Sequence, residues 1–379
     1  MRDMLGTIVL DRSRAARPQI EEQMRDLILD GKLRPGTKLP SSSALAELLS
    51  THVPTVHAAL RPLVLEGLLS RAHRSGTFVR EREKRITCAG IYYGDDFLTS
   101  KAFRMQAVVH GAIHAEIKRI LFEMDINTSV WIDTRPVEIQ NTPWPELVRA
   151  VERREIQAVI SSTADRVHLD WLSALPVPSA HGSSWHRPNT VTDDGEMFWE
   201  LSMRALAERG CHSVGIIARL FRHRPRDFEK AVEVASELGI AMRDEWTFTM
   251  DSDAPEGVMP NAGEGYAGFC TLWKRNERPD GLIVFPDALS SGVILALLEQ
   301  GVRVPDDLAV VMHKDQDIDM FCPLPVTFVG SSARRRAEAL VEQVMRQARG
   351  EACESVVLPY ERTDSYMIPL NRDTIGRVA

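Results

Sequence analysis

The chain has 379 residues, of which 44% are hydrophobic, and this length and composition fit two or three packed domains. No window reaches the roughly 18 uninterrupted apolar residues of a membrane span, and the N-terminus lacks the apolar core and cleavage site of a secretory signal. The five cysteines lie far apart and form no CxxC pair, which disfavours a disulfide framework and a cysteine zinc site. We therefore expect a cytoplasmic protein that does not contact a membrane.

The charge is unevenly distributed along the chain. The net charge is −7, yet residues 1–85 hold 15 basic and 10 acidic side chains, which leaves 31 basic and 43 acidic ones for the rest. A basic N-terminal unit therefore precedes an acidic body. Phosphate contacts with DNA require local positive charge, although an excess of this size is also within ordinary variation.

Three short helices are predicted in the N-terminal unit. Apolar residues recur at helical spacing from residue 17 to residue 30. Ser41 can cap a second, short helix by accepting a backbone hydrogen bond. A third helix is predicted from residue 54 to residue 66, with Pro54 in the first turn, where a missing N–H costs nothing.

Two short strands are predicted next, at 68–71 and 76–79, around a basic tip. Three helices and a β-ribbon make a winged helix-turn-helix, whose third helix enters the major groove and whose wing reaches the DNA backbone or minor groove. We expect this head, residues 1–79, to bind double-stranded DNA. Its candidate contacts are Lys38, Ser41, Ser42, Ser43, Thr55, His57, Arg61, His73, Arg74 and Gly76.

The head resembles the GntR family of bacterial regulators. Spacing and identity agree over stretches that include 31–41, 55–56, 66–69 and 76–79. By motif alignment, three arginines that usually serve DNA in this family correspond here to Ser43, Val53 and His57. Because these side chains cannot make the bidentate guanine contact of arginine, the resemblance implies a different operator or a larger share of wing and phosphate contacts. His57 is equally compatible with a solvated surface histidine.

Residues 80–85 are wholly charged and predict a linker to a body at 86–370. In the body, runs typical of strands alternate with amphipathic stretches typical of helices, which predicts an α/β fold of doubly wound parallel sheets, long enough for two lobes. Ligands bind at the carboxyl ends of such strands, so the lobes would share one cleft. Strands are predicted at 86–93, 127–132, 156–161, 213–218, 246–250, 281–285 and 308–312. Helices are predicted at 103–124, 145–154, 194–210, 226–238, 263–276, 290–300 and 332–349.

The body resembles the LacI/GalR effector domain, which is itself similar to periplasmic sugar-binding proteins. The resemblance covers most of the body loosely, at 205–215, 278–287, 301–311 and 323–327, and it is most specific at 301–311. A GntR-type head with a LacI-type body is found in arabinose-repressor-like regulators. This resemblance implies a homodimer formed through the first lobe, a small effector between two periplasmic-binding-protein-like lobes, and coupling of lobe closure to operator affinity.

The effector site is only partly similar to that of the family. The family's sugar-contacting arginine corresponds to Arg224 and its acidic residue to Asp287, but His313 and Lys314 stand where the family has Phe-Asp. Lys314 would favour an acidic sugar or another anion, unless it pairs with Asp287 or Asp315 and the cleft holds a different ligand or none. The candidate effector contacts are Tyr93, Asp95, Trp185, Arg224, Asp287, His313 and Lys314.

No nucleotide-binding, zinc-protease or serine-hydrolase motif occurs in the sequence. Residues 181–186 hold two histidines and two serines and are interpreted as a loop, and the run 334–336 of three arginines as a solvated face or an interface. We expect no enzyme activity, cofactor or metal. The predicted function is a dimeric transcription repressor controlled by a small carbohydrate-like or anionic effector. The alternatives are a ligand-independent DNA-binding regulator and, with less support, a pyridoxal-phosphate-dependent aminotransferase body, for which the lysines are few.

Overall fold

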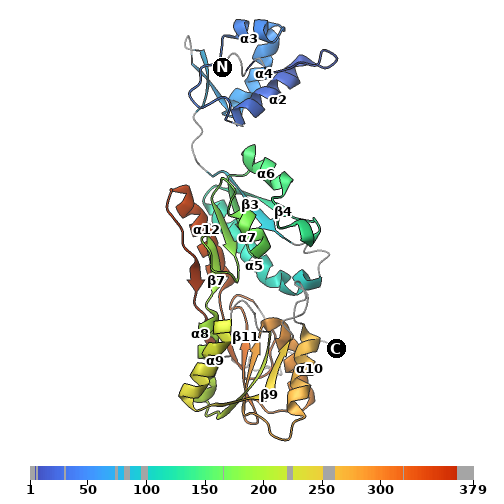
Figure 1. Ribbon diagram of the computed structural model, residues 1–379, viewed down its shortest axis with the longest axis vertical. Helices are drawn as coiled ribbons and strands as arrows, with labels where there is room; N and C mark the ends of the chain where they lie inside the picture. Colours follow the sequence, from blue (N-terminus) through green and yellow to red (C-terminus); the bar gives the residue numbers. More distant parts are fainter. Residues whose placement is uncertain are drawn as a thin grey trace, which may run out of the picture.

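The computed structural model describes residues 5, 7–29, 31–72, 76–80, 86–94, 101–164, 166–219, 225–250, 261–318 and 320–364. They form a small N-terminal head and a body of two α/β lobes that follow one another along the long axis (Figure 1). This is the fold class that the alternating pattern predicts. Among these residues, no helix is long and apolar enough to cross a membrane.

The head packs helices against a β-ribbon around one apolar core. Ser41 accepts a hydrogen bond of 3.2 Å from the backbone nitrogen of Ala44, which confirms the predicted cap. The core includes Ile20, Met24 and Leu60, each at most 1% exposed. The head elements are α2 (Ala16–Leu29), α3 (Ser42–Leu48), α4 (Val53–Leu65), and the antiparallel strands β1 (Leu69–Ala72) and β2 (Gly76–Val79).

The first lobe is a parallel sheet in the order β13-β7-β6-β5-β3-β4. Helices α5 and α12 cover one face, where Ile117 and Leu340 belong to one buried cluster, and α6 and α7 cover the other. Its strands are β3 (Cys88–Tyr93), β4 (Asn127–Ile132), β5 (Ala158–Ser161), β6 (Ser179–Gly182), β7 (Thr190–Asp193) and β13 (Val356–Leu358). Its helices are α5 (Lys101–Glu123), α6 (Pro145–Glu152), α7 (Arg166–Leu172) and α12 (Ala333–Ala348).

The second lobe has the order β14-β12-β11-β10-β8-β9, parallel except for the antiparallel edge strand β14. Helices α8 and α9 cover one face, and α10 and α11 cover the other. Its strands are β8 (Ser213–Arg219), β9 (Ala241–Met250), β10 (Gly281–Phe285), β11 (Ala309–His313), β12 (Thr327–Gly330) and β14 (Glu361–Asp364). Its helices are α8 (Gly195–Glu208), α9 (Pro225–Leu238), α10 (Ala262–Trp273) and α11 (Ser290–Glu299).

Within the described residues the chain crosses between the lobes three times. The crossings follow β7, β12 and β13, so no lobe is one continuous segment. Because α12 packs on the first lobe while β12 belongs to the second, residues 331–332 form the middle crossing. These crossings join the lobes at the edge where the carboxyl ends of many strands lie.

Several predicted boundaries are wrong in this structure. The interpretation of 181–186 as a loop fails at its start, because His181 and Gly182 belong to β6. His181 is fully buried and its Nδ1 lies 3.1 Å from the hydroxyl of Ser161, so a polar residue occupies a central strand and one of its two ring nitrogens has a partner inside the lobe. Helix α7 and strands β12, β13 and β14 were not predicted, and β9 begins at Ala241, five residues before the predicted strand.

Two leucines of α4 provide a stability test of the head. Leu60 is 1% exposed and Leu65 is 79% exposed. We expect Leu60→Ala to destabilise the head by about 2–5 kcal/mol, because it leaves a cavity, and Leu65→Ala to change its stability by less than about 0.5 kcal/mol. Hydrogen exchange of head peptides measures this. All seven tryptophans lie in the body, so tryptophan fluorescence should show that both variants leave the unfolding of the body unchanged. Equal protection of head amides from exchange in the two variants would contradict the burial of Leu60.

Candidate functional site

The exposed side of α4 carries the predicted reading residues. Val56 and Leu60 face the core, whereas His57 and Arg61 are exposed and Thr55 is half-buried. Within the described part of the chain, neither His57 nor Arg61 forms an ion pair. The start of α4 therefore presents polar side chains to solvent, and no described carboxylate neutralises the charge of Arg61.

Lys38 lies at the base of the wing. Its backbone forms a β-bridge with Phe78, and its ammonium stands 5.8 Å from the centre of the Phe78 ring. Gly76 has a φ of +116°, and a Cβ there would lie 3.0 Å from Cε of Lys38, so a bulkier residue would press on this lysine. Three serines follow Lys38 in the sequence, at the start of α3. Ser41 and Ser43 are exposed, and Ser42 is half-buried. His73 and Arg74 lie outside the described residues.

In the same domain, Arg25 has a different environment. It forms ion pairs of 2.8 Å with Glu66 and 2.9 Å with Glu21. Glu66 follows α4 directly, so this pair joins α2 to the end of α4. Arg25 is therefore neutralised within the head, whereas Lys38 and Arg61 form no ion pair with another described residue.

In the second lobe, Asp287 and His313 meet at the carboxyl ends of β10 and β11. The backbone N–H of Asp287 donates to Nδ1 of His313 at 3.2 Å, and the Asp287 carboxylate lies 3.8 Å from the same nitrogen. Burial raises the pKa of Asp287, but His313 and backbone donors outweigh it and the pKa is lowered. Burial lowers the pKa of His313, but Asp287 and then Asp315 outweigh it and the pKa is raised.

The next residue, Lys314, faces different surroundings. His313 packs edge-on to the rings of Phe198, Phe285 and Tyr360, whereas the Lys314 ammonium lies 5.5 Å from the ring of Phe328. No ion pair of Lys314 with Asp287, Asp315 or any other described residue is present. The pairing considered as the alternative to an anion-binding role is therefore not seen among these residues. Arg224 and Asp95 lie outside the described residues.

A buried polar cluster links the lobes beside this site. Arg336 of α12 binds Asp193 at 2.8 Å and Asp315 at 3.0 Å. Burial lowers the pKa of its guanidinium, but the two carboxylates outweigh burial and raise it. His110 of α5 is 8% exposed; burial, and then the charge of Arg336, lower its pKa to about 4.

The two aromatic candidates of the first lobe differ in accessibility. Tyr93 is fully buried, its hydroxyl lies 2.5 Å from Nδ1 of His114, and the two rings are parallel at 5.9 Å. In this arrangement one face of its ring is covered by His114. Trp185 is half-buried in the loop after β6, where its backbone N–H donates to the Ser183 hydroxyl at 3.2 Å and its ring lies 5.7 Å from the Arg166 guanidinium.

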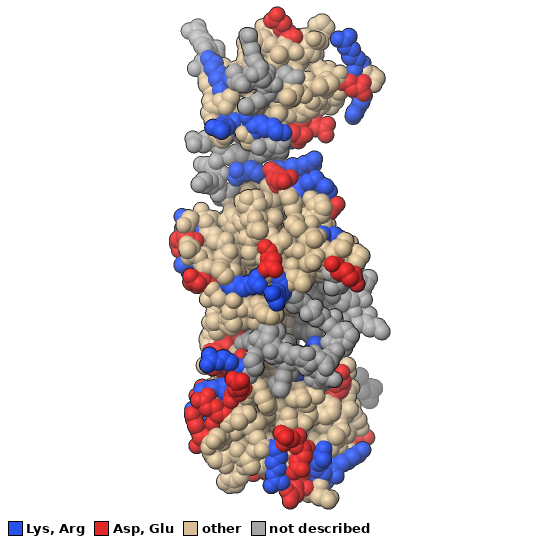
Figure 2. All heavy atoms as spheres, viewed as in Figure 1, with Lys and Arg blue, Asp and Glu red and all other residues tan. Residues whose placement is uncertain are grey.

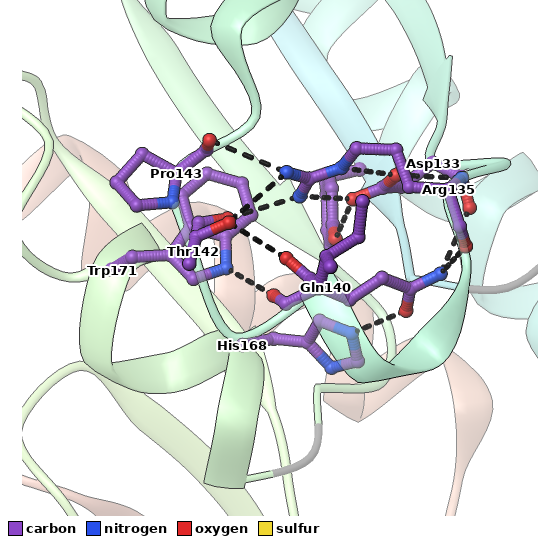
Figure 3. A network of polar contacts seen from close by, with 9 residues as sticks. Asp133, Arg135, Gln140, Thr142, Pro143, His168 and Trp171 are labelled. Carbon is purple, nitrogen blue, oxygen red and sulfur yellow. Dashed lines mark hydrogen bonds and ion pairs between the residues drawn. The ribbon is translucent and has the colours of Figure 1, made fainter.

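A further network at the carboxyl edge of the first sheet was not predicted (Figure 3). Asp133 directly follows β4 and is 1% exposed; it accepts hydrogen bonds from the Tyr92 hydroxyl at 3.0 Å and from Arg135 at 2.7 Å. Gln140 joins the same loop to α7 through His168 at 2.9 Å and the Trp171 indole at 2.9 Å. In the sequence, only the position of Asp133 immediately after a predicted strand could have indicated this network. The network fixes the loop between β4 and α6.

Comparison with known proteins separates the same two parts. Residues 16–79 match the family described as bacterial regulatory proteins, gntR family, and residues 203–362 match the periplasmic binding protein-like domain. The HTH-type transcriptional repressor PurR of Haemophilus influenzae strain PittEE is 28% identical over 219 residues, 54% of this chain and 60% of that protein. PurR of Glaesserella parasuis is 26% identical over 149 residues, 39% and 42% respectively. The chain spans about half the length of these curated relatives.

Solved structures agree with the fold of the body. The transcription regulator CcpA of Lactococcus lactis superposes with a TM-score of 0.56 and 16% identity, over 74% of this chain and 98% of that one. The Lac repressor dimer bound to operator and the anti-inducer ONPF gives a TM-score of 0.56 and 16% identity, over 74% and 94%. The chain therefore joins a winged helix-turn-helix head that matches the gntR family model to a body that matches the periplasmic binding protein-like domain and has the fold of these solved regulators.

Proposed function

We propose that this protein is a transcription repressor whose head binds operator DNA and whose body binds a small effector between its lobes. The observation that carries the proposal is the covalent union of two parts: an α4 surface with exposed His57 and Arg61, which form no ion pair with another described residue, and a two-lobed body. The PurR relatives, described as transcriptional repressors, support this over the part they share. It would act by binding rather than by catalysis, in the cytoplasm where the chromosome lies.

The effector would lie where the carboxyl ends of the two sheets approach each other. Asp287 and His313 lie at strand ends of the second lobe, and His110 lies on α5 of the first lobe. Asp287 supplies a charged acceptor, and Lys314 supplies a charged donor that no described carboxylate neutralises. These groups suit a carbohydrate-like or anionic effector with several hydroxyls. Trp185, Tyr93, Asp95 and Arg224 remain candidate contacts.

A homodimer would use one flank of the body. Phe122 and Val130 are 81% and 50% exposed on the first lobe, and Leu295 and Leu298 of α11 are 58% and 50% exposed on the second. Helix α10, which packs on α11, lies on the same flank as β4 (Figure 1). Exposed apolar residues on both lobes along one flank suit an interface between two copies. Two heads would then contact a pseudo-palindromic site.

The DNA-binding proposal predicts different effects for two head residues. We expect Lys38→Ala to weaken binding to all sequences about equally and to lower the salt slope by about one, because it removes a phosphate contact. His57→Ala should change the preferred sequence, because its position faces the major groove. Selection from random DNA and salt titration measure both. Arg149→Ala on α6, in the body, is the control. A salt-insensitive complex, or an unchanged selected motif for His57→Ala, would overturn the respective assignment.

The effector proposal predicts ligand-dependent stability of the body. A true effector at a hundredfold excess over its Kd should stabilise the body by about 2.7 kcal/mol. A thermal-shift screen of sugars, sugar acids and related metabolites, followed by tryptophan fluorescence, measures this. Asp287→Asn should reduce the shift, whereas Asp306→Asn, at an exposed position before the amino end of β11 and thus opposite the proposed site, should preserve it. No shift with any compound would favour the ligand-independent alternative, and an absorbance band typical of a Schiff base would favour the aminotransferase.

The dimer proposal predicts a difference between two exposed apolar residues. We expect Leu295→Arg on α11 to raise the dimer dissociation constant at least about tenfold, since it places a charge in an apolar interface. Val232→Arg on α9 is the matched control, since Val232 is 50% exposed on the other side of the second lobe. Sedimentation analysis over a concentration series measures both. Equal dissociation constants for the two variants would place the interface elsewhere.

A further inference from the structure

Arg336 lies where the crossings between the lobes come together. Its Nε and Nη2 bind the carboxylate of Asp193, the last residue of β7, at 3.1 and 2.8 Å, and Asp194 then caps α8 of the second lobe. Its Nη2 also donates to the hydroxyl of Ser331 in the middle crossing. One side chain is thus in contact with both the first and the middle crossing.

The same guanidinium reaches the second lobe directly. Asp315, two residues beyond β11, accepts from Arg336 at 3.0 Å and from the Ser331 hydroxyl at 3.3 Å. Its neighbour Asp317 accepts from the Ser332 hydroxyl at 2.6 Å and from the backbone N–H of Arg334 at 3.1 Å. The loop after β11 is therefore bound to the first turn of α12, which packs on the first lobe.

The environment of Arg336 differs from that of the two arginines before it. Arg334 and Arg335 have side chains that are 63% and 48% exposed, and they pair with Glu338 and Glu361. The Arg336 side chain is 17% exposed, and the carboxylates it binds are 22% exposed for Asp193 and 3% for Asp315. Charges held this far from water interact much more strongly than surface ion pairs, and removal of one partner leaves an uncompensated charge.

We propose that Arg336 sets the relative angle of the two lobes by binding the first crossing, the middle crossing and the loop after β11 at once. Rotation of one lobe against the other moves Asp315 relative to α12, so it must lengthen the contact between Arg336 and Asp315. The side chain therefore resists lobe motion without any ligand. It would also link the strand end that carries His313 to the first lobe. This inference rests on the proposed function only for its consequence at the operator.

Two backbone hydrogen bonds report on this region. The Asp194 N–H donates to the Leu358 carbonyl at 2.9 Å between the first and third crossings, and the Gln316 N–H donates to the Ser331 carbonyl at 2.9 Å. We expect both amides to exchange at least about tenfold faster in Arg336→Met than in the wild type. Amides of β5 and β10 should exchange at rates closer to wild type. Arg334→Met, which removes only a pair within α12, is the matched control and should leave the two reporter amides unchanged.

A double variant separates this role from simple support of the fold. Arg336→Met leaves a buried unpaired carboxylate at Asp315, and the added change Asp315→Asn removes that charge, so thermal stability should recover in part in the double variant, in which Asp193 still lacks Arg336. The reporter amides should remain fast, because the link between the lobes is still absent. Wild-type exchange in Arg336→Met, or its return in the double variant, would overturn the proposal. The measurement needs neither DNA nor effector, so it can fail independently of the proposed function.

Discussion

The three crossings of the chain constrain everything else in the body. Each lobe is assembled from separate segments, so neither sheet is complete until the chain has passed between the lobes and returned. The crossings must bury backbone and polar side chains near the junction, and such groups need partners. Asp193, Ser331 and Asp315 find theirs in Arg336. The ion pairs of Arg336 therefore satisfy the buried polar groups between the lobes. The same region borders the candidate effector site.

Most of the fold could be predicted from local pattern, because it depends on periodicity. The head core repeats at helical spacing, and Ser41 caps α3 as its position suggests. Strands such as β10, with the sequence GLIVF, are apolar throughout because helices cover both faces of the sheet. The short strands β13 and β14 escaped prediction, since three or four residues at the hinge carry too little pattern. Strand β6 escaped because its buried polar residues find partners only in the folded lobe.

The candidate site was less predictable, because burial and pairing are tertiary properties. Sequence position alone suggested that Tyr93 could stack on a ligand, yet the folded lobe encloses it against His114. A run of three arginines suggested a solvated face, which describes Arg334 and Arg335 but not Arg336. Helical geometry explains this difference, because successive residues point about 100° apart and only one of three neighbours faces the junction.

The head and the body carry net charges of opposite sign. Acidic and basic side chains lie next to each other on the second lobe (Figure 2), where pairs such as Arg243–Glu245 at 3.3 Å and Arg204–Glu200 at 2.9 Å neutralise one another. The body nevertheless carries the excess of acidic residues, so its long-range field repels phosphate. The head, with an excess of basic residues, attracts it. Under the proposed function, this contrast in field would help to hold DNA at the head rather than at the body.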